Sequence, residues 1–318
     1  MKILVTGGAG FIFTNFIRNV LYNNLYEIVS IDKILLEKSL HNIYSNKNHK
    51  SYIGDIADEH FVNLIMKIEK PDLIINGAAE SFVDSSITNI NPFIHSNING
   101  MQTIINAALK HNIKLIQCST DEVYGHLNNE DDPSWKEDAP INPRNPYAAT
   151  KASSELLVKA AGNTHGLKYL ITRSCNNFGP RQPLRNLIPV VINAILNKKD
   201  IPVYGQGKQI REWIYVADFN FALLKLIELF KNDIITNDVY NISSGFEISN
   251  LEMVNHICNI IGYGHDKITF VKDRPGHDFR YSCDSSKLRN LGWKPESKFL
   301  DGLQETVNWY VKNQWYLK

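Results

Sequence analysis

Short apolar runs alternate with longer amphipathic stretches through the first half of the chain. The runs with the length and composition of buried strands are Lys2–Val5, Glu27–Ile31, Asp72–Ile75, Lys114–Gln117 and Lys168–Ile171. Apolar residues recur at three- and four-residue spacing, as they do in helices, over Asn15–Tyr22, Asp58–Lys67, Ile98–His111 and Tyr147–Asn163. This alternation predicts an α/β fold, namely a Rossmann-like, doubly wound parallel sheet covered by helices on both faces.

The second half of the chain is less regular. After Arg173, loops rich in proline and glycine separate the elements, although Ile214–Phe230 again indicates a strand or loop followed by a helix. We therefore expect two domains. Residues 1–172 and 208–244 would form the Rossmann domain, and residues 173–207 and 245–318 would form a smaller α/β lobe that binds the substrate.

The composition excludes several classes of protein. With 318 residues, of which 43% are hydrophobic, the chain can bury a large core. Its 34 Lys+Arg and 33 Asp+Glu give a net charge of +1, so we expect no nucleic-acid partner and no attraction to an anionic membrane. Apolar runs such as Leu187–Leu196 are shorter than the ~20 residues that span a bilayer. A strand follows Met1 almost directly, so we expect no secretory signal.

The cysteines indicate a reducing environment. Cys118, Cys175, Cys258 and Cys283 show no CxxC spacing and are too few for a disulfide scaffold. We expect a cytoplasmic protein without a metal site.

A glycine-rich turn follows the first predicted strand. Gly7 and Gly10 lie between Ile3–Val5 and an amphipathic stretch, where a strand-to-helix turn can bring its backbone against a pyrophosphate. Such a turn can also use glycine for its positive φ alone, without any ligand. Its sequence context decides between these two interpretations.

Two carboxylates provide that context. Asp32 ends the second strand, where it can accept both hydrogen bonds of an adenosine ribose and would repel a 2′-phosphate, so NAD is favoured over NADP. Asp55 and Ile56 follow another short extended run and could frame the adenine, while Asp55 could equally cap the next helix.

A tyrosine and a lysine lie one helical turn apart near the middle of the chain. Tyr147 and Lys151 follow Pro146 and share one helix face at i, i+4. A nearby ammonium group and a positive nicotinamide ring favour the phenolate, so Tyr147 could remove a hydroxyl proton as hydride leaves. The spacing by itself is common on surface helices, and it gains meaning only together with the glycine turn and Asp32.

Two adjacent acids follow the strand Lys114–Gln117. Asp121 and Glu122 belong to the segment Ser119–Gly125, at the carboxyl end of the sheet where ligands bind in this architecture. They could be part of a solvated turn. They could also divide two proton transfers, one removing a carbon-bound proton and one protonating a departing hydroxyl. Both can reach one sugar only if the chain bends there, because adjacent residues of a strand face opposite ways.

These segments resemble a known family. The pattern GxxGxxG with Asp32 downstream resembles the extended short-chain dehydrogenase/reductase family, and Ser119–Gly125, which reads Ser-Thr-Asp-Glu-Val-Tyr-Gly, resembles the signature of its nucleotide-diphosphate-glucose 4,6-dehydratases. Further segments resemble those of the family in their usual order: Ala78–Ser81, Asn176–Pro180, Arg211–Tyr215 and Arg274–Asp278. The resemblance therefore extends over nearly the entire chain.

The resemblance implies a catalytic cycle for Thr120, Asp121, Glu122, Tyr147 and Lys151. Tyr147 would take the proton of the glucose C4 hydroxyl as hydride passes from C4 to NAD, with Thr120 bonded to the same hydroxyl and Lys151 tuning the phenol. Glu122 would then remove the C5 proton while Asp121 protonates the leaving C6 hydroxyl. Return of hydride to C6 would give a 4-keto-6-deoxy sugar nucleotide, a precursor of deoxysugars such as rhamnose, so the enzyme would be a lyase.

The resemblance also implies the binding residues. For NAD they are Gly7, Gly10, Phe11, Ile12, Asp32, Lys33, Asp55, Ile56, Ala78, Ala79, Ser81, Asn97, Ser119, Tyr147, Lys151 and Asn177. For the sugar nucleotide they are Ser81, Thr120, Asp121, Glu122, Asn176, Leu187, Ile188, Pro202, Tyr204, Arg211, Asn250, Arg274, His277 and Asp278. Arginine forks such as those of Arg211 and Arg274 suit phosphate oxygens.

Three positions depart from the family pattern. Phe13 occupies the place of the third glycine, so its ring must point elsewhere or the first helix must shift. Phe82 and Arg181 replace other residues beside the substrate motifs. The nucleoside stays open between thymidine and uridine, and the helices Asn99–His111 and Tyr147–Asn163 would form a homodimer interface as in family members.

Two other functions are weighed against the dehydratase. A nucleotide-sugar 4-epimerase or decarboxylase of the same family generally carries small or hydroxyl residues at the positions of Asp121 and Glu122. A non-catalytic dinucleotide-binding protein often loses the tyrosine and lysine, which this chain retains as Tyr147 and Lys151.

Overall fold

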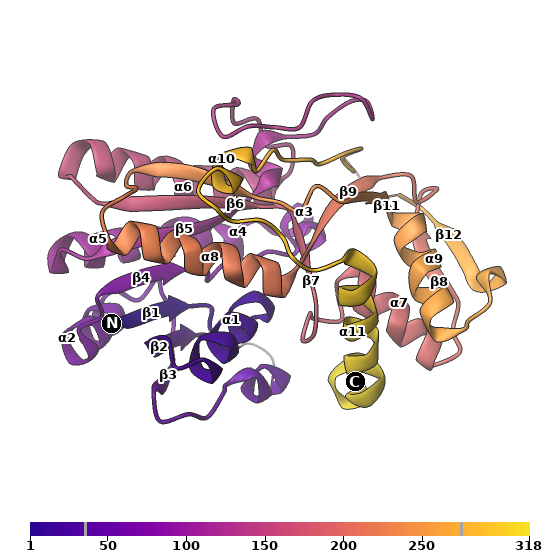
Figure 1. Ribbon diagram of the computed structural model, residues 1–318, viewed down its shortest axis with the longest axis horizontal. Helices are drawn as coiled ribbons and strands as arrows, with labels where there is room; N and C mark the ends of the chain where they lie inside the picture. Colours follow the sequence, from indigo (N-terminus) through magenta and orange to yellow (C-terminus); the bar gives the residue numbers. More distant parts are fainter. Residues whose placement is uncertain (35–36, 274–275) are drawn as a thin grey trace. The chain divides into compact units, whose positions relative to one another are not determined.

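Two compact units make up the chain. The computed structural model describes residues 1–34, 37–273 and 276–318 (Figure 1). The first unit comprises Met1–Val123, Ile141–Arg173 and Leu223–Tyr240, and the second comprises Tyr124–Pro140, Ser174–Ala222 and Asn241–Lys318. Each unit is described by itself below.

The first unit is built on a seven-stranded parallel sheet with the order β10-β6-β5-β4-β1-β2-β3. Its strands are β1 (Lys2–Thr6), β2 (Glu27–Asp32), β3 (His49–Ile53), β4 (Leu73–Asn76), β5 (Lys114–Thr120), β6 (Tyr169–Ser174) and β10 (Asp238–Ile242). The central strands β1, β4 and β6 are buried along almost their whole length, as expected when helices cover both faces of a parallel sheet. The predicted α/β fold is confirmed.

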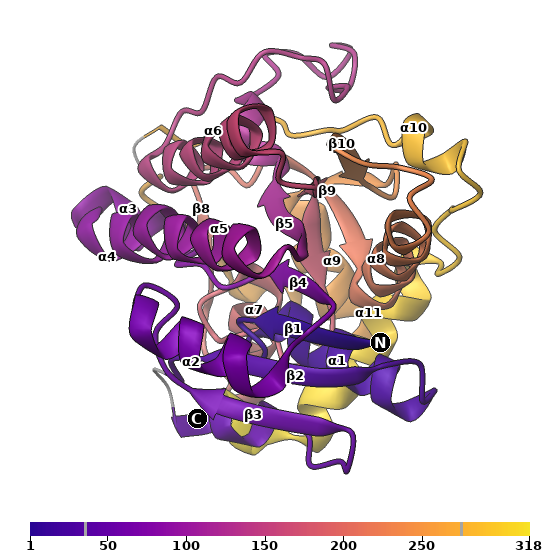
Figure 2. The same cartoon turned by 90° about the vertical axis from the view of Figure 1, so that its left-hand side faces the viewer.

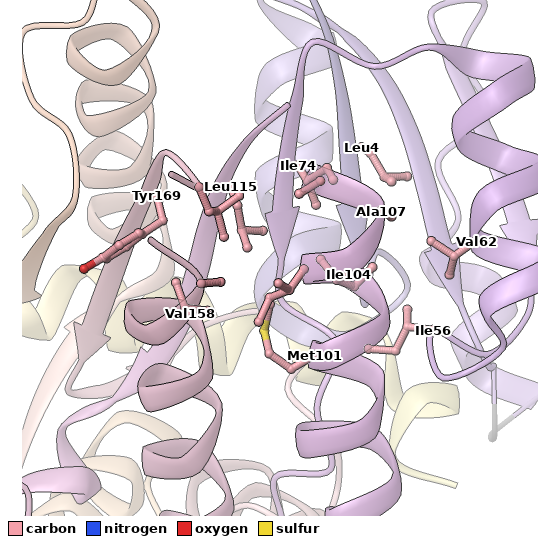
Figure 3. Packing of buried hydrophobic residues seen from close by; sticks show 14 of the residues in the cluster. Leu4, Ile56, Val62, Ile74, Met101, Ile104, Ala107, Leu115, Val158 and Tyr169 are labelled. Carbon is pink, nitrogen blue, oxygen red and sulfur yellow. The ribbon is translucent and has the colours of Figure 1, made fainter. Parts of the chain in front are cut away.

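Helices cover the sheet on both sides (Figure 2). The helices of this unit are α1 (Phe11–Tyr22), α2 (Glu59–Glu69), α3 (Val83–Thr88), α4 (Asn91–Phe93), α5 (Gly100–His111) and α6 (Pro146–His165), with a π-helical turn at Ile94–Asn99 and 3-10 turns at Glu37–Asn42 and Asp121–Tyr124. α8 (Val216–Lys231) contributes its residues from Leu223 onward. Figure 3 shows the core that α2, α5 and α6 form with the sheet, through Val62, Ile104, Val158, Leu4, Ile74 and Leu115.

The strand order reverses its direction of growth between β1 and β4, and this is the position where open α/β sheets bind ligands. The two strands end together, because Thr6 is in register with Asn76. The Thr6 hydroxyl donates to the Asn76 side chain at 2.5 Å and accepts the backbone N–H groups of Gly77 and Ala78 at 3.2 and 3.1 Å. The loops that follow β1 and β4 are thereby held against each other.

The second unit contains two small sheets. A three-stranded sheet has the order β11-β9-β7, and a two-stranded parallel sheet pairs β12 with β8. The elements are β7 (Asn176–Phe178), α7 (Leu187–Leu196), β8 (Ile201–Tyr204), β9 (Ile210–Tyr215), β11 (Glu247–Ser249), α9 (Asn250–Ile261), β12 (Ile268–Val271), α10 (Ser286–Arg289) and α11 (Phe299–Lys312), with 3-10 turns at His265–Lys267 and Gln314–Leu317.

The compact units divide the chain differently from the predicted domains at residues 124–140 and 208–222, and by one to four residues at 173 and 241–244. Residues 208–222 group with the second unit because β9 pairs with β7 and β11 and takes no part in the large sheet. Residues 124–140 also group there, since Leu127 and Trp135 form β-bridges with Arg280 and Cys283. Both differences come from pairings between segments far apart in the sequence.

Among the described residues, no helix is both long enough and apolar enough to cross a membrane.

Candidate functional site

The turn after β1 has the features of an anion-binding loop. Gly7 has a φ of +72°, and a Cβ added there would lie 2.9 Å from the Ala78 backbone, so both its conformation and its surroundings require glycine. Gly10 is the N-cap of α1, which has no side-chain cap and no acid in its first turn, where Phe11 and Ile12 lie. The N–H groups of this helix end are left for an anion such as a pyrophosphate.

Asp32 is fixed beside this turn. Its carboxylate accepts the backbone N–H groups of Ala9 at 3.0 Å and Ile34 at 2.9 Å. The chain thus holds a negative charge at the end of β2, next to the glycine turn, where a ribose diol can donate to it.

Asp55, one of the two residues predicted to frame the adenine, lies in an ion-paired cluster. The Asp55 carboxylate lies 3.1 Å from Lys33 Nζ and 2.8 Å from His95 Nε2, and it accepts the Ala57 N–H at 2.8 Å. The cap of α2 is Asp58, whose side chain accepts the N–H of Phe61, so the capping role considered for Asp55 belongs to Asp58. Ile56 is buried in the core beneath α5.

Other predicted cofactor residues lie around the ends of β4 and β5. Ala78 and Ala79 follow β4, Ser119 is the penultimate residue of β5, and the Ser119 Oγ is buried without a hydrogen-bond partner among the described residues. Asn97 bonds to the backbone N–H and C=O of Glu80 and to Thr150, so it ties the segment after β4 to α6. A buried hydroxyl with no protein partner fits a site that a polar ligand group completes.

Phe13 finds its space at Gly77. Its ring is buried, and a Cβ added to Gly77 would lie 1.8 Å from the Phe13 ring. The ring also packs edge-on against Phe16 at 6.2 Å. Gly77, directly after β4, has no side chain, and this leaves space for the Phe13 ring. Helix α1 can therefore begin at the glycine turn although Phe13 stands where the family pattern has a third glycine.

Because this space is already filled, Gly77→Ala is expected to destabilise the protein by about 1–3 kcal/mol. Phe13→Ala should destabilise it as well, by leaving a cavity. In Phe13→Ala/Gly77→Ala the new methyl group enters that cavity, so the double variant should be clearly more stable than the sum of the single effects predicts. Urea unfolding of the four proteins measures this, and strictly additive effects would contradict the packing described.

The chain bends at Asp121 and Glu122, which is the condition for both side chains to reach one sugar. β5 ends at Thr120, and a 3-10 turn begins at Asp121. Asp121 is buried, and the Thr120 hydroxyl donates to its carboxylate at 3.1 Å. Glu122 is partly exposed, and its backbone N–H donates to Thr120. Both acids lie close enough to Tyr147 to raise the pKa of its phenol, so the structure brings the predicted catalytic groups together.

Tyr147 is held as a neutral phenol by the protein alone. Burial raises its pKa most strongly, the carboxylates of Glu122 and Asp121 raise it further, and a hydrogen bond between Tyr147 and Thr120 acts in the opposite direction. Lys151 is buried on the same face of α6, and its Nζ donates to the Cys118 carbonyl at 2.6 Å. Burial lowers the pKa of Lys151, an effect that Cys118 and Glu155 oppose. A positive charge placed beside Tyr147 would lower this pKa and favour the phenolate.

Asn145 is a site residue that the sequence analysis missed. Its side-chain carbonyl caps α6 by accepting the Ala148 N–H at 2.8 Å, and its amide donates to the Glu122 carboxylate at 2.7 Å. The signal was present, since an asparagine before a proline is a typical helix start. The contact with Glu122 depends on the fold and could not be inferred locally.

In the second unit, two of the predicted substrate residues, Tyr204 and His277, are in contact. The His277 ring packs edge-on against Tyr204 at 6.3 Å and bonds to Asp273 at 2.6 Å. Pro202 and Tyr204 are exposed on β8. Arg274 lies outside the described residues. Asn176 and Asn177 belong to β7, Leu187 and Ile188 begin α7, and Asn250 begins α9; Ile188 is fully buried in the core.

Arg211 and Asp278 are joined through the backbone. The guanidinium of Arg211 donates to the Asp278 carbonyl at 3.0 Å and lies 4.6 Å from the centre of the Tyr281 ring. The Asp278 carboxylate is buried and accepts the Tyr281 hydroxyl, with His126 at 3.6 Å. The predicted ligand Asp278 thus has structural partners of its own, and it orders the segment to which Arg211 bonds.

The neighbouring Glu212 links β9 to two other segments. Its carboxylate accepts the N–H groups of Gly245 at 2.5 Å and Cys283 at 3.0 Å. Burial raises its pKa from 4.5 to about 7, against the effect of these two hydrogen bonds.

This raised pKa predicts a pH dependence of stability. Between about pH 4.5 and 7 the folded state retains a proton that the unfolded chain releases, so the stabilisation present at low pH is lost as the pH rises through about 7. Glu212→Gln, which cannot ionise, should flatten this slope. Urea unfolding at about pH 5 and about pH 8 tests it, and an equal slope in both proteins would mean that another group is responsible.

Arg181, one of the departures from the family pattern, is bound to the C-terminal helix. It has a φ of +71°, its guanidinium lies 5.1 Å from the centre of the Trp309 ring, and its carbonyl accepts the Tyr316 hydroxyl at 2.9 Å. Tyr310 bonds in the same way to the next carbonyl, that of Gln182. Phe82, another departure, precedes α3 as its N-cap residue.

The fold and the site define the class of this protein. A glycine turn at the switch point of a Rossmann sheet, a carboxylate after β2, and a tyrosine and lysine on α6 characterise the extended short-chain dehydrogenases/reductases. The chain belongs to the GDP-mannose 4,6 dehydratase family, whose model matches residues 4–306.

Known proteins match almost the whole chain. A low-salt glycan biosynthesis protein of Haloferax volcanii is 46% identical, and the match covers 98% of this chain and 99% of that protein. A dTDP-glucose 4,6-dehydratase of Actinoplanes is 39% identical, with 99% of each chain covered. The solved structure of DesIV, a dTDP-glucose 4,6-dehydratase of Streptomyces venezuelae with NAD and a thymidine nucleotide bound, is 35% identical and superposes with a TM-score of 0.93 over 100% of both chains.

Proposed function

We propose that this protein is an NAD-dependent nucleotide-diphosphate-glucose 4,6-dehydratase. The observation that carries the proposal is the turn at Asp121–Tyr124, which brings two carboxylates close to the phenol of Tyr147. Oxidation of an alcohol by NAD needs only the tyrosine and lysine from the protein, whereas removal of water across C5 and C6 also needs a base and an acid. The site contains all four groups.

NAD, when bound, accepts hydride from C4 and returns it to C6. The glycine turn, Asp32 and Ser119 are the residues that would hold it. Tyr147 accepts the proton of the C4 hydroxyl in this step. Since the protein alone favours the neutral phenol, proton removal by Tyr147 is coupled to the arrival of the positively charged cofactor, with Lys151 on the same helix face supporting the phenolate.

The carboxylates serve the elimination. The C4 ketone acidifies the C5 proton, which Glu122 removes, and Asp121 gives a proton to the departing C6 hydroxyl. The burial of Asp121 supports this division, and so do the greater exposure of Glu122 and the hydrogen bond that Glu122 accepts from an amide. Burial favours the neutral acid, and the amide favours the carboxylate that acts as base.

We assign dTDP-glucose as the substrate, because the Actinoplanes relative is named for it and DesIV contains a thymidine nucleotide. The exposed Pro202 and Tyr204 on β8 offer an apolar surface for the base, and His277 beside Tyr204 offers a ring nitrogen for the phosphates. Arg211 is buried and already donates to the Asp278 carbonyl, so as a phosphate ligand it would have to exchange that bond. The product, a 4-keto-6-deoxy sugar nucleotide, would feed the synthesis of deoxysugars such as rhamnose.

Incubation of the purified protein with dTDP-glucose or UDP-glucose and catalytic NAD, followed by mass spectrometry, tests the proposal. Loss of one water from the sugar nucleotide is expected, faster with dTDP-glucose. An unchanged mass with inversion at C4 would indicate the 4-epimerase, loss of carbon dioxide in a parallel incubation with UDP-glucuronic acid would indicate the decarboxylase, and inactivity with every substrate would favour a non-catalytic protein.

We also propose that the enzyme is a homodimer formed through α5 and α6. The α6 side chain Leu156 is 56% exposed in the single chain, and a second copy of α6 packed against it would bury this leucine. Leu156→Asp should shift the protein to a monomer in sedimentation velocity. A wild-type protein that sediments as a monomer would contradict the proposal.

We also propose a reducing, cytoplasmic location, because the four cysteines are buried free thiols: Cys118, Cys175, Cys258 and Cys283.

A further inference from the structure

Asn145 forms two hydrogen bonds that connect two parts of the site. Its side-chain carbonyl accepts the Ala148 N–H at 2.8 Å, and its side-chain N–H donates to Glu122 at 2.7 Å. Its backbone is extended, with φ −131° and ψ 161°, and Pro146 begins the helix directly after it. The cap therefore fixes the orientation of the amide, because a flipped amide would place an N–H against the N–H of Ala148 and an oxygen against a carboxylate.

Asn145 connects the segment that carries Glu122 to the helix that carries Tyr147. Asn145 precedes α6, the helix that carries Tyr147 and Lys151, whereas Glu122 belongs to the 3-10 turn after β5. The hydrogen bond between Asn145 and Glu122 thus joins the segment that acts at C5 to the helix that acts at C4. A hydrogen bond to the carboxylate reduces the number of rotamers that Glu122 can sample on its partly exposed turn.

We propose that Asn145 is a positioning residue for Glu122, which orients its carboxylate toward C5 and keeps it available as a base. The inference rests on the proposed dehydratase function. An amide is well suited to this role, since it donates to one carboxylate oxygen both before and after the other oxygen takes the proton. The hydrogen bond therefore persists through removal and return of the C5 proton.

Substitutions at Asn145 can separate the cap from the donor. Asn145→Ser keeps a good N-cap but loses the amide donor, and Asn145→Asp keeps the cap while placing a second carboxylate opposite Glu122. Asn145→Ala loses both interactions. The unfolding temperature should therefore be close to that of the wild type for the serine variant and lower for the alanine variant. This comparison controls for the structural role of the cap.

The expected result is a selective loss of elimination. In Asn145→Ser, water loss from dTDP-glucose should slow by about 10- to 100-fold, as expected for a lost hydrogen bond to a charged group. Oxidation at C4 should continue, so the absorbance of reduced nicotinamide should build up during turnover, while the KM stays within about twofold because binding contacts are untouched. Asn145→Asp should eliminate water still more slowly.

Two results would overturn the inference. One is wild-type elimination by Asn145→Ser without reduced nicotinamide building up. The other is an equal loss of oxidation and elimination in all three variants that follows their unfolding temperatures, which is what a purely structural cap predicts. A wild-type protein that removes no water from any nucleotide sugar would instead refute the proposed function, so the two failures are distinguishable.

Discussion

Tyr147→Phe is expected to lower dehydratase turnover by about 10²–10⁴-fold, with no reduced nicotinamide formed. The phenyl ring keeps the packing against Phe93, whose ring centre lies 6.4 Å from that of Tyr147, but it removes the only group of α6 proposed to take the C4 proton. Since every later step needs the C4 ketone, the entire cycle stops before it begins. Stopped-flow absorbance and product analysis on the same samples measure both effects.

Glu122→Gln provides the comparison for this prediction. It removes the base for C5 but leaves Tyr147, Lys151 and Thr120 in place, so oxidation should proceed and reduced nicotinamide should accumulate without loss of water. Neither variant should therefore form product, but the absorbance of reduced nicotinamide should rise in Glu122→Gln and stay unchanged in Tyr147→Phe. Equal inactivity without any absorbance change would contradict the separate roles of Tyr147 and Glu122.

Glu155→Gln is expected to destabilise the first unit by about 3–5 kcal/mol. Glu155 and Arg173 form an ion pair with side chains 0% and 1% exposed, in which the guanidinium donates to both carboxylate oxygens at 2.7–3.2 Å. Removing the carboxylate charge leaves Arg173 buried without compensation, and desolvation of that charge is the main cost. Urea unfolding measures the free energy directly.

Replacing both partners tests whether the charge itself is responsible. Glu155→Leu/Arg173→Met removes both charges at similar volume, so it should be considerably more stable than Glu155→Gln. Lys168→Ala serves as the surface control, because its partner Asp233 is exposed, and it should leave unfolding nearly unchanged. A double variant less stable than Glu155→Gln would mean that packing, rather than uncompensated charge, explains the loss.

Local patterns predicted much of the large sheet. The five apolar runs correspond to β1, β2, β4, β5 and β6, and the periodic stretches correspond to α1, α2, α5 and α6, because buried parallel strands and their covering helices have strong, continuous patterns. The bend required at Asp121 is also present, as a 3-10 turn. The strands and helices depend on neighbouring residues and so show in the periodicity of the sequence, whereas the bend was expected only as a condition for both acids to reach one sugar.

Long-range complementarity could not be predicted in the same way. The room for Phe13 comes from Gly77, the partner of Glu122 is Asn145, and β9 pairs with β7 and β11 in a separate small sheet. In each case the decisive contact joins segments that no local pattern relates. The assignment of residues 124–140 to the second unit has the same origin, in bridges to the segment around Arg280 and Cys283.

The most direct test of the account follows the hydrogen at C4. dTDP-glucose carrying deuterium at C4 is incubated with the wild-type protein and a trace of unlabelled NAD, and the product is examined by mass spectrometry and NMR. The account predicts loss of one water with the deuterium retained at C6, because the same cofactor returns the hydride that it accepted. Deuterium that stays at C4, is lost to solvent, or appears in a product that still contains the C6 hydroxyl would contradict the dehydratase cycle.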